Sequence, residues 1–204
     1  MKKIVLITFL VLLIDQLTKI YVKTHFALYE SKEIFSWFRI TYMENLGMAY
    51  GISFGKEMGK NILTIFRIVM IVFIGIWLFK SVKQKASNYF IIPISLIFAG
   101  ALGNLIDSIF YGLFFSSGTT FTASTYAGIS KLDFTGYAPI LQGAVVDMLE
   151  FPLFSFVIPQ WVPVFGGKLF EFFKPIFNVA DSAISIGVLF LILFHNKAFP
   201  KENT

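Results

Sequence analysis

The sequence contains no cysteine and only two histidines among its 204 residues. Without cysteine, neither a disulfide bond nor a thiol nucleophile is available. Thiolate and imidazole are the usual protein ligands of zinc and related metals, so the chain offers little material for a transition-metal site. We therefore expect no metal and no other cofactor.

Charge is also scarce, because charged residues make up 14% of the chain and hydrophobic residues 56%. A soluble domain of this length needs a more highly charged surface. The net charge of +5 does not form a basic stripe of the kind that binds nucleic acid, since the lysines and arginines lie in short segments between apolar runs. The composition predicts a membrane protein that does not bind nucleic acid.

Four apolar runs are long enough to cross a membrane as helices, at about residues 3–22, 61–79, 89–110 and 177–194. About 20 apolar residues cross ~30 Å of hydrocarbon. The first run resembles a secretory signal peptide, but no small-residue cleavage site follows it, so we expect a retained span. None of the runs alternates as the strands of a barrel do. We predict an all-α membrane protein with four transmembrane helices and a single domain, 1–204.

The basic residues predict the orientation of these spans. Lys80, Lys83 and Lys85 lie between the second and third runs with no acid among them. The 23–60 segment has five basic and four acidic residues, and the 111–176 segment has three and four. Because cytoplasmic segments carry an excess of lysine and arginine, both termini are expected in the cytoplasm and both long segments outside.

The two outer segments are expected to contain structure of their own. The 23–60 segment alternates apolar and polar residues between Phe35 and Tyr42, which predicts short strands and a small extracytoplasmic β-like cradle. The 111–137 stretch is rich in glycine, serine and threonine and predicts a long flexible loop. The phenylalanine-rich stretch 165–177 is expected to lie along the membrane surface.

Ionisable residues within spans are costly, so each needs a specific role. The predicted topology gathers four carboxylates in the outer half of the membrane: Asp15, Asp107, Asp147 and Asp181. Asn104 and Asn178 each precede an aspartate by three residues, which places amide and carboxylate on one helix face. Two carboxylates in a partly dry site share one proton, so one can accept a proton from water while the other donates to a carbonyl oxygen. This pattern is typical of peptide hydrolysis by paired aspartates.

Other interpretations of these residues remain open. The acids could cap helices and pair with Lys19 or Arg67. A small proton-coupled membrane transporter could use the same carboxylates, although the chain has no internal repeat and transport does not explain why the acids gather at the outer face. The run Gly51-Ile-Ser53-Phe-Gly55 fits a serine nucleophile elbow, but the α/β sheet that this motif needs is not predicted. A purely structural membrane subunit is the last alternative.

Five short runs, in order along the chain, resemble the lipoprotein signal peptidase family, also called signal peptidase II. These runs are Asp15-Gln-Leu-Thr-Lys19, Asn45-Leu-Gly-Met-Ala-Tyr-Gly51, Gly100-Ala-Leu-Gly-Asn104-Leu-Ile-Asp107, Val145-Val-Asp147 and Phe177-Asn-Val-Ala-Asp181-Ser.

The resemblance implies a membrane aspartyl endopeptidase that cleaves prolipoproteins just before a diacylglyceryl-modified cysteine. It implies that Asp147 and Asp181 are the catalytic pair. It also implies a set of substrate-binding or supporting residues: Asn104, Asp107, Asn178, Asn45, Gly47, Asp15 and Lys19. We expect the 23–60 cradle to clamp the lipidated substrate, and the enzyme to act as a monomer among phospholipids near the outer face of a bacterial inner membrane.

The chain departs from the family pattern in four places. Ser108 stands where an arginine usually follows the Asn-x-x-Asp motif, and Met148 stands where an aromatic residue usually follows Val-Val-Asp. The source of positive charge near the substrate is therefore open, with Arg39 and Lys131 as candidates. Two stretches are longer than usual, 111–142 and 152–175.

Overall fold

The computed structural model describes the chain except for residues 48–56, 122–123, 127, 173–174 and 201–204. Within the described ranges, three helices are long and apolar enough to cross a membrane. They are α1 (Lys2–His25), α2 (Glu57–Lys83) and a 27-residue helix that joins α3 (Asn88–Ile106), the π-helical turn η1 (Asp107–Tyr111) and α4 (Gly112–Phe114).

The region of the fourth predicted span forms a shorter apolar helix. This helix, α5 (Val179–Leu193), has 15 residues and is followed by the short α6 (His195–Ala198). At 1.5 Å per residue it is about 22 Å long, less than the ~30 Å of a hydrocarbon core. Three of the predicted spans are therefore found as helices of spanning length, and the fourth as a shorter helix.

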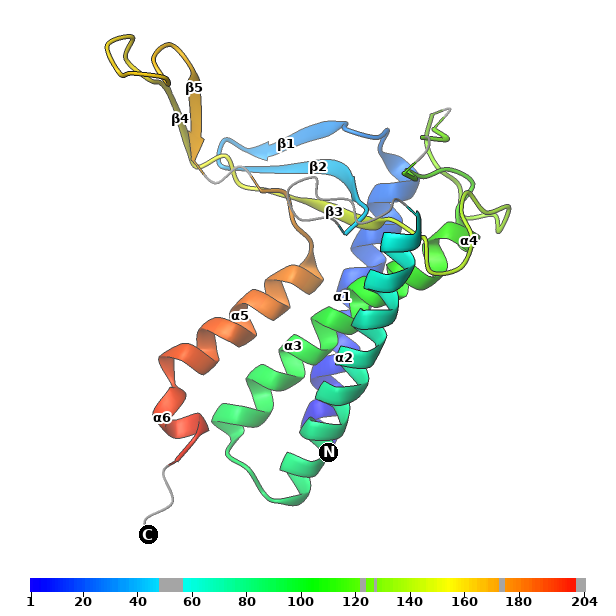
Figure 1. Ribbon diagram of the computed structural model, residues 1–204, viewed down its shortest axis with the longest axis vertical. Helices are drawn as coiled ribbons and strands as arrows, with labels where there is room; N and C mark the ends of the chain where they lie inside the picture. Colours follow the sequence, from blue (N-terminus) through cyan, green and yellow to red (C-terminus); the bar gives the residue numbers. More distant parts are fainter. Residues whose placement is uncertain (48–56, 122–123, 127, 173–174, 201–204) are drawn as a thin grey trace.

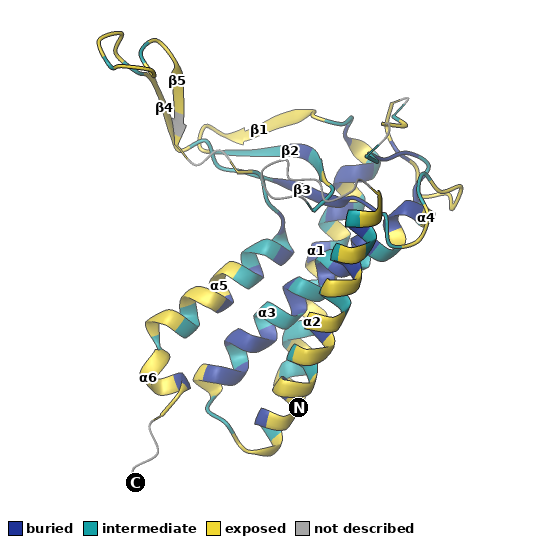
Figure 2. Cartoon of the chain, viewed as in Figure 1, coloured by how far each residue is buried: buried dark blue, intermediate teal, exposed yellow. Residues whose placement is uncertain are grey.

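The exposed faces of the helices are apolar. Within an apolar stretch of 18 residues in each helix, the buried share is 11% in α1 and 17% in α2. In the Asn88–Phe114 helix it is 50%. Figure 2 shows exposed residues along the outer sides of α1 and α2, and many of these are large hydrophobic side chains, such as Phe9, Phe66 and Phe73. Such faces need a lipid environment, because a soluble monomer rarely exposes so large an apolar area.

Small residues let α5 pack closely against α3. A Cβ at Gly100 would collide with the Ala180 carbonyl oxygen, and one at Gly187 would lie 2.7 Å from the Pro93 carbonyl oxygen. Buried Ala180 and Ala183 complete the contact face of α5. Close approach of backbones through small residues is the usual way in which helices associate in membranes.

A three-stranded antiparallel sheet lies at one end of the helices, and the N-terminus and α6 lie at the other (Figure 1). Its strand order is β1 (Ser31–Phe35), β2 (Phe38–Asn45) and β3 (Val145–Glu150). The strands predicted in the 23–60 segment are confirmed as β1 and β2. Strand β3 was not predicted from the sequence, and it adds part of the second outer segment, 111–176, to the same sheet.

A second, two-stranded sheet projects away from the rest of the molecule (Figure 1). It pairs β4 (Phe154–Val157) with β5 (Leu169–Phe172). The 165–177 stretch was expected to lie along a membrane surface, whereas much of it belongs to this hairpin. The label all-α is likewise too narrow, since the fold is mostly helical with two small antiparallel sheets.

Candidate active site

Strand β3 is joined to the beginning of α5, although 28 residues separate them along the chain. The Leu149 amide donates to the Phe177 carbonyl oxygen at 2.7 Å, and the Phe177 amide donates back at 3.1 Å. The next residue, Asn178, caps α5 in a capping box, in which its side chain accepts from the Asp181 amide at 2.8 Å. This junction brings Asp147 of β3 and Asp181 of α5 to one place.

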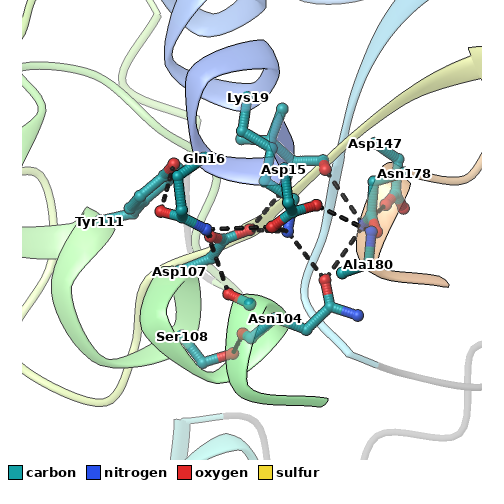
Figure 3. A network of polar contacts seen from close by, with 12 residues as sticks. Asp15, Gln16, Lys19, Asn104, Asp107, Ser108, Tyr111, Asp147, Asn178 and Ala180 are labelled. Carbon is teal, nitrogen blue, oxygen red and sulfur yellow. Dashed lines mark hydrogen bonds and ion pairs between the residues drawn. The ribbon is translucent and has the colours of Figure 1, made fainter. Parts of the chain in front are cut away.

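Two asparagines connect these two aspartates. The Asn178 side-chain amide donates to Asp147 Oδ1 at 2.6 Å and to Asn104 Oδ1 at 3.1 Å (Figure 3). Asn104 in turn donates to Asp181 Oδ1 at 2.7 Å. The two carboxylates are therefore linked through one continuous chain of hydrogen bonds, and both asparagines are orientated by it.

Asp147 lies in an environment that disfavours its charge. Its side chain is 3% exposed. Burial, and then the nearby charge of Asp181, raise the pKa of Asp147 to about 7, although the hydrogen bonds donated by Asn45 and Asn178 act to lower it. A carboxyl group of this kind holds a proton near neutral pH, which is the property required of a general acid.

The remaining two aspartates have a cation between them. Lys19 Nζ lies 2.9 Å from Asp15 Oδ2 and 2.8 Å from Asp107 Oδ2, and all three side chains are fully buried. Lys19 also donates to Asn104 Oδ1 at 2.9 Å. Asp15 accepts from the Ala180 amide at 2.9 Å, at the N-terminus of α5. The interpretation of the acids as ion-paired groups is therefore correct for Asp15 and Asp107. Their interpretation as helix caps is correct for Asp15 and also for Asp181, whose Oδ2 accepts from the Asn178 amide in the capping box of α5.

Asp107 also fixes β3 to the helices. It accepts from Gln16 Nε2 at 2.9 Å and from the Val146 amide at 3.3 Å, next to Asp147 (Figure 3). Tyr111 donates to Gln16 Oε1 at 3.1 Å. The sequence analysis named neither Gln16 nor Tyr111 as a site residue, and the position of Gln16 beside Asp15 was the available signal.

Asn45 and Gly47 form a turn at the edge of this group. Asn45 Oδ1 accepts from the Gly47 amide at 2.7 Å, and Asn45 Nδ2 donates to Asp147 Oδ2 at 3.2 Å. Gly47 has φ of +81°, and a Cβ there would lie 2.9 Å from both Leu63 Cδ2 and Arg67 Nη2. The backbone conformation favours glycine at this position, and any larger residue would also displace the ends of the Leu63 and Arg67 side chains.

Neither candidate for the positive charge in place of the missing arginine, Arg39 or Lys131, contacts the site aspartates within the described part of the chain. Arg39 lies 3.5 Å from Glu33 in an exposed pair, and Lys131 is exposed. Arg67 of α2 instead donates from Nη1 to Ser108 Oγ at 3.1 Å, at the position where the family pattern has arginine. Arg67 could have been recognised in the sequence, because it is the single arginine that interrupts the apolar run 61–79.

A second buried polar cluster tethers the outer segments to α1. The Lys23 side chain is fully buried and forms an ion pair with Glu44. Its Nζ also donates to the Tyr42 hydroxyl at 3.1 Å and to the Tyr126 hydroxyl at 3.0 Å. Glu44 also accepts from the Thr119 amide at 2.6 Å. Although burial alone would raise it, Lys23 and the tyrosine donors hold the pKa of Glu44 below its usual range. The cluster joins α1, β2 and the 111–144 segment.

Two further features of the sequence concern a serine nucleophile and a metal site. Ser53, the residue of the possible nucleophile elbow, lies outside the described residues, as does the 48–51 part of the second family run. In the ranges that are described, no group of three or more His, Cys, Asp or Glu side chains is arranged to hold a metal ion.

The chain is similar to known proteins along most of its length. Residues 7–196 match the family model described as signal peptidase (SPase) II. A lipoprotein signal peptidase of Porphyromonas gingivalis is 43% identical over 185 residues, covering 90% of this chain and 78% of the relative. One of Amoebophilus asiaticus is 34% identical over 191 residues, covering 92% and 75%.

The fold also resembles a solved structure. A bacterial membrane enzyme matches with a TM-score of 0.62 and 27% identity, covering 98% of this chain and 96% of that one. The family match extends over nearly the whole chain and includes every residue of the hydrogen-bonded group around Asp147 and Asp181. The chain belongs to the signal peptidase II family.

Proposed function

We propose that this protein is an aspartic endopeptidase that removes signal peptides from prolipoproteins, cleaving just before the diacylglyceryl-modified cysteine. The named relatives support a lipoprotein-processing peptidase and give no support to a proton-coupled transporter. The family match supports a prolipoprotein as the substrate, and we propose that this substrate is lipidated.

The observation that carries the aspartic mechanism is the difference between the two pairs of acids. Asp15 and Asp107 share Lys19, and their charge is compensated. Asp147 and Asp181 form no ion pair with any cation in the described ranges, and they are joined only through asparagine amides. Asp147 is buried and Asp181 is half-buried. Two neighbouring carboxylates without a paired cation, in a partly dry site, keep one proton between them, as proteolysis by two aspartates requires.

The proposed chemistry assigns a role to each member. Asp181 acts as the general base and takes a proton from water, whose oxygen bonds to the scissile carbonyl carbon. Asp147 gives its proton to the carbonyl oxygen. When the tetrahedral intermediate collapses, the C–N bond breaks, Asp181 passes its proton to the leaving amine, and Asp147 recovers a proton from the hydroxyl that becomes the carbonyl. The raised pKa of Asp147 supports its role as the proton holder.

The remaining proposed site residues act on this pair. Asn104 and Asn178 orientate the carboxylates, and Asn45 with Gly47 forms the edge that faces Asp147. Asp15, Lys19 and Asp107 fix α1, η1, β3 and α5 relative to one another: Asp15 Oδ1 accepts from the first turn of α5, and Asp107 accepts from β3.

The proposed setting is the bacterial inner membrane, with 1–204 as one monomeric domain surrounded by phospholipid. We propose that α5 is the fourth span, that both termini are cytoplasmic, and that the site lies near the outer face. The excess of lysine between α2 and α3, on the side of the N-terminus and α6, supports this orientation. The sheet end would then receive the substrate, with the strands as a cradle.

The test is cleavage of a synthetic lipidated prolipoprotein by the purified protein in detergent micelles. Asp147→Asn and Asp181→Asn are each expected to lose turnover while the protein still folds. Asp133→Asn, which changes an exposed aspartate in the outer loop, is the matched control and is expected to cleave normally. Appreciable turnover by either of the first two variants would contradict the assignment.

A further inference from the structure

The two faces of strand β2 have different surroundings at the end of the strand. Residues of a strand alternate between its faces, and Met43 is paired with Asp147 across β2 and β3, so Asn45 lies on the same face as Asp147. Asn45 Nδ2 donates to Asp147 Oδ2 at 3.2 Å. Glu44 lies on the opposite face, where it is paired with the fully buried Val146. The residue next to Asn45 is therefore directed away from the aspartates.

Among the described residues, the last part of β2 has neighbouring backbone on one side only. On the side of β1, backbone bonding reaches Tyr42, whose amide donates to the Glu30 carbonyl oxygen at 2.9 Å. On the other side, β3 pairs with β2 as far as Asn45 with Val145, and Asn45 is the last residue of β2. A strand held along one edge can twist about its axis, and a twist here would turn the Asn45 side chain away from Asp147. The contact between these two residues therefore needs a further support.

The side chain of Glu44 provides this support. Its Oε1 accepts from Lys23 Nζ and from the hydroxyl groups of Tyr42 and Tyr126, at 2.8 Å and 2.7 Å for the two hydroxyls. Its Oε2 accepts from the Thr119 amide at 2.6 Å. The donors lie on α1, on β2 itself and in the 111–144 segment. Charge-assisted hydrogen bonds from several parts of the chain fix the position of a carboxylate, and this carboxylate fixes the backbone that carries it.

The 111–144 segment also surrounds the cation of this pair. Lys23 Nζ lies 5.0 Å from the ring centres of Phe115 and Tyr137 and 5.4 Å from that of Tyr126, distances typical of cation–π contacts. The side chains of Lys23 and Glu44 are 0% and 1% exposed. A buried ion pair adds little net stability, because the cost of desolvation offsets the attraction. Its directional contacts therefore point to a role in selecting one arrangement of the chain around it.

We propose that Glu44 is a positioning residue for the catalytic pair. The 111–144 segment and α1 hold its carboxylate, and the end of β2, fixed in this way, holds Asn45 against Asp147. The stretch 111–142 is longer than is usual in the family pattern, and this role gives the added chain a part in the reaction. The proposal rests on the aspartic mechanism proposed above, and it adds the support that orientates Asp147 from the side of β2.

The test is a double-mutant cycle in the rate of single-turnover cleavage of a lipidated peptide by the purified protein in detergent micelles. The first change is Lys23→Met together with Glu44→Gln, which removes the ion pair without leaving a buried charge unpaired. The second change is Asn45→Ala. When Asn45 is present, the first change should lower the rate about 10-fold, because misplacement of a catalytic group is costly. In the Asn45→Ala protein it should lower the rate less than about 2-fold, since the contact through which it acts is already absent.

A milder variant and a matched control separate positioning from stability. Tyr126→Phe keeps the ion pair and removes one donor to Glu44, so it should give a smaller loss of rate with the same dependence on Asn45. Leu78→Ala opens a cavity among buried side chains at the end of α2 that is remote from the sheet (Figure 1). This control should lower Tm while each folded molecule cleaves at the wild-type rate. Rates are therefore compared per folded molecule, with the folded fraction measured by size-exclusion chromatography.

This proposal and the aspartic mechanism fail in different ways. A loss of rate that is equal with and without Asn45 would overturn the role of Glu44, and so would an unchanged rate when Asn45 is present. Turnover by Asp147→Asn or Asp181→Asn would instead contradict the aspartic mechanism. If both of those variants are inactive and the losses do not depend on Asn45, only the role of Glu44 is contradicted.

Discussion

Replacing Asp147 with asparagine should abolish cleavage and, at alkaline pH, make the protein more stable. The pKa of the Asp147 carboxyl is raised from 3.8 to about 7 in the folded protein. Between these values the folded protein binds more protons than the unfolded chain, so the free energy of unfolding falls as pH rises, and the loss is complete above about pH 7. A difference of about 3 in pKa corresponds to about 4 kcal/mol.

Asparagine removes this cost but also loses one hydrogen bond. Asn45 and Asn178 each donate to one oxygen of Asp147, and an asparagine side chain can accept only one of them. The lost bond costs about 1 kcal/mol. The net gain at pH 8 should therefore be about 3 kcal/mol, or roughly 6 to 12 °C in the apparent Tm for a chain of this size. At pH 4 the variant should be slightly less stable than the wild type.

The assay is thermal unfolding in detergent micelles, followed by tryptophan fluorescence at pH 4, 6 and 8. Asp107→Asn is the matched control, because it also neutralises a fully buried aspartate but breaks an ion pair with Lys19. That variant should melt below the wild type at pH 8. If Asp147→Asn melts lower than the wild type by a similar amount, the Asp147 charge is stabilised in the folded state, and Asp147 is not the proton holder.

Other variants test the surrounding structure. Lys19→Met leaves two buried carboxylates without their cation and should cost about 3–5 kcal/mol, seen as a large loss of Tm or of folded protein on size-exclusion chromatography. Gly47→Ala, at φ of +81° and 2.9 Å from Arg67, should lower the cleavage rate at least ~10-fold with only ~1–2 kcal/mol lost in unfolding; normal turnover would show that the turn can adjust. Tyr126→Phe removes a donor to Glu44 and should make the 111–144 segment cleave faster in limited proteolysis, with about 1 kcal/mol lost. EDTA should leave the cleavage rate unchanged, and a loss restored by zinc would contradict metal-independent chemistry.

Three of the spans, the strands β1 and β2, and the gathering of the aspartates could be predicted from the sequence. Apolar runs of sufficient length have few alternatives to helices in a membrane, and period-2 alternation between Phe35 and Tyr42 indicates strands. A carboxylate within a span draws attention by its cost alone. These signals are local, so each could be recognised without knowledge of the partner segment.

The pairing of the acids could not be derived in this way. Asp15 and Asp107 both pair with Lys19. Lys19 lies one helical turn from Asp15, so the spacing along the chain indicates the contact with Asp15 but not the contact with Asp107. The strand β3 was missed because Val145–Glu150 has no alternating pattern, being buried along most of its length. The partner of Ser108 was missed because contact between α2 and η1 depends on how the helices pack, which no spacing along the chain encodes.

The β-bridge between Leu149 and Phe177 makes the segment between these residues a suitable place for insertions. The backbone leaves β3 and returns at one β-bridge, so everything between is closed at its base. Lengthening such a closed segment is cheap, since each doubling costs only about 0.6 kcal/mol in closure entropy. The hairpin tip, where Trp161 is 82% exposed, is therefore a natural place to insert an affinity tag or a fluorescent label without moving either aspartate.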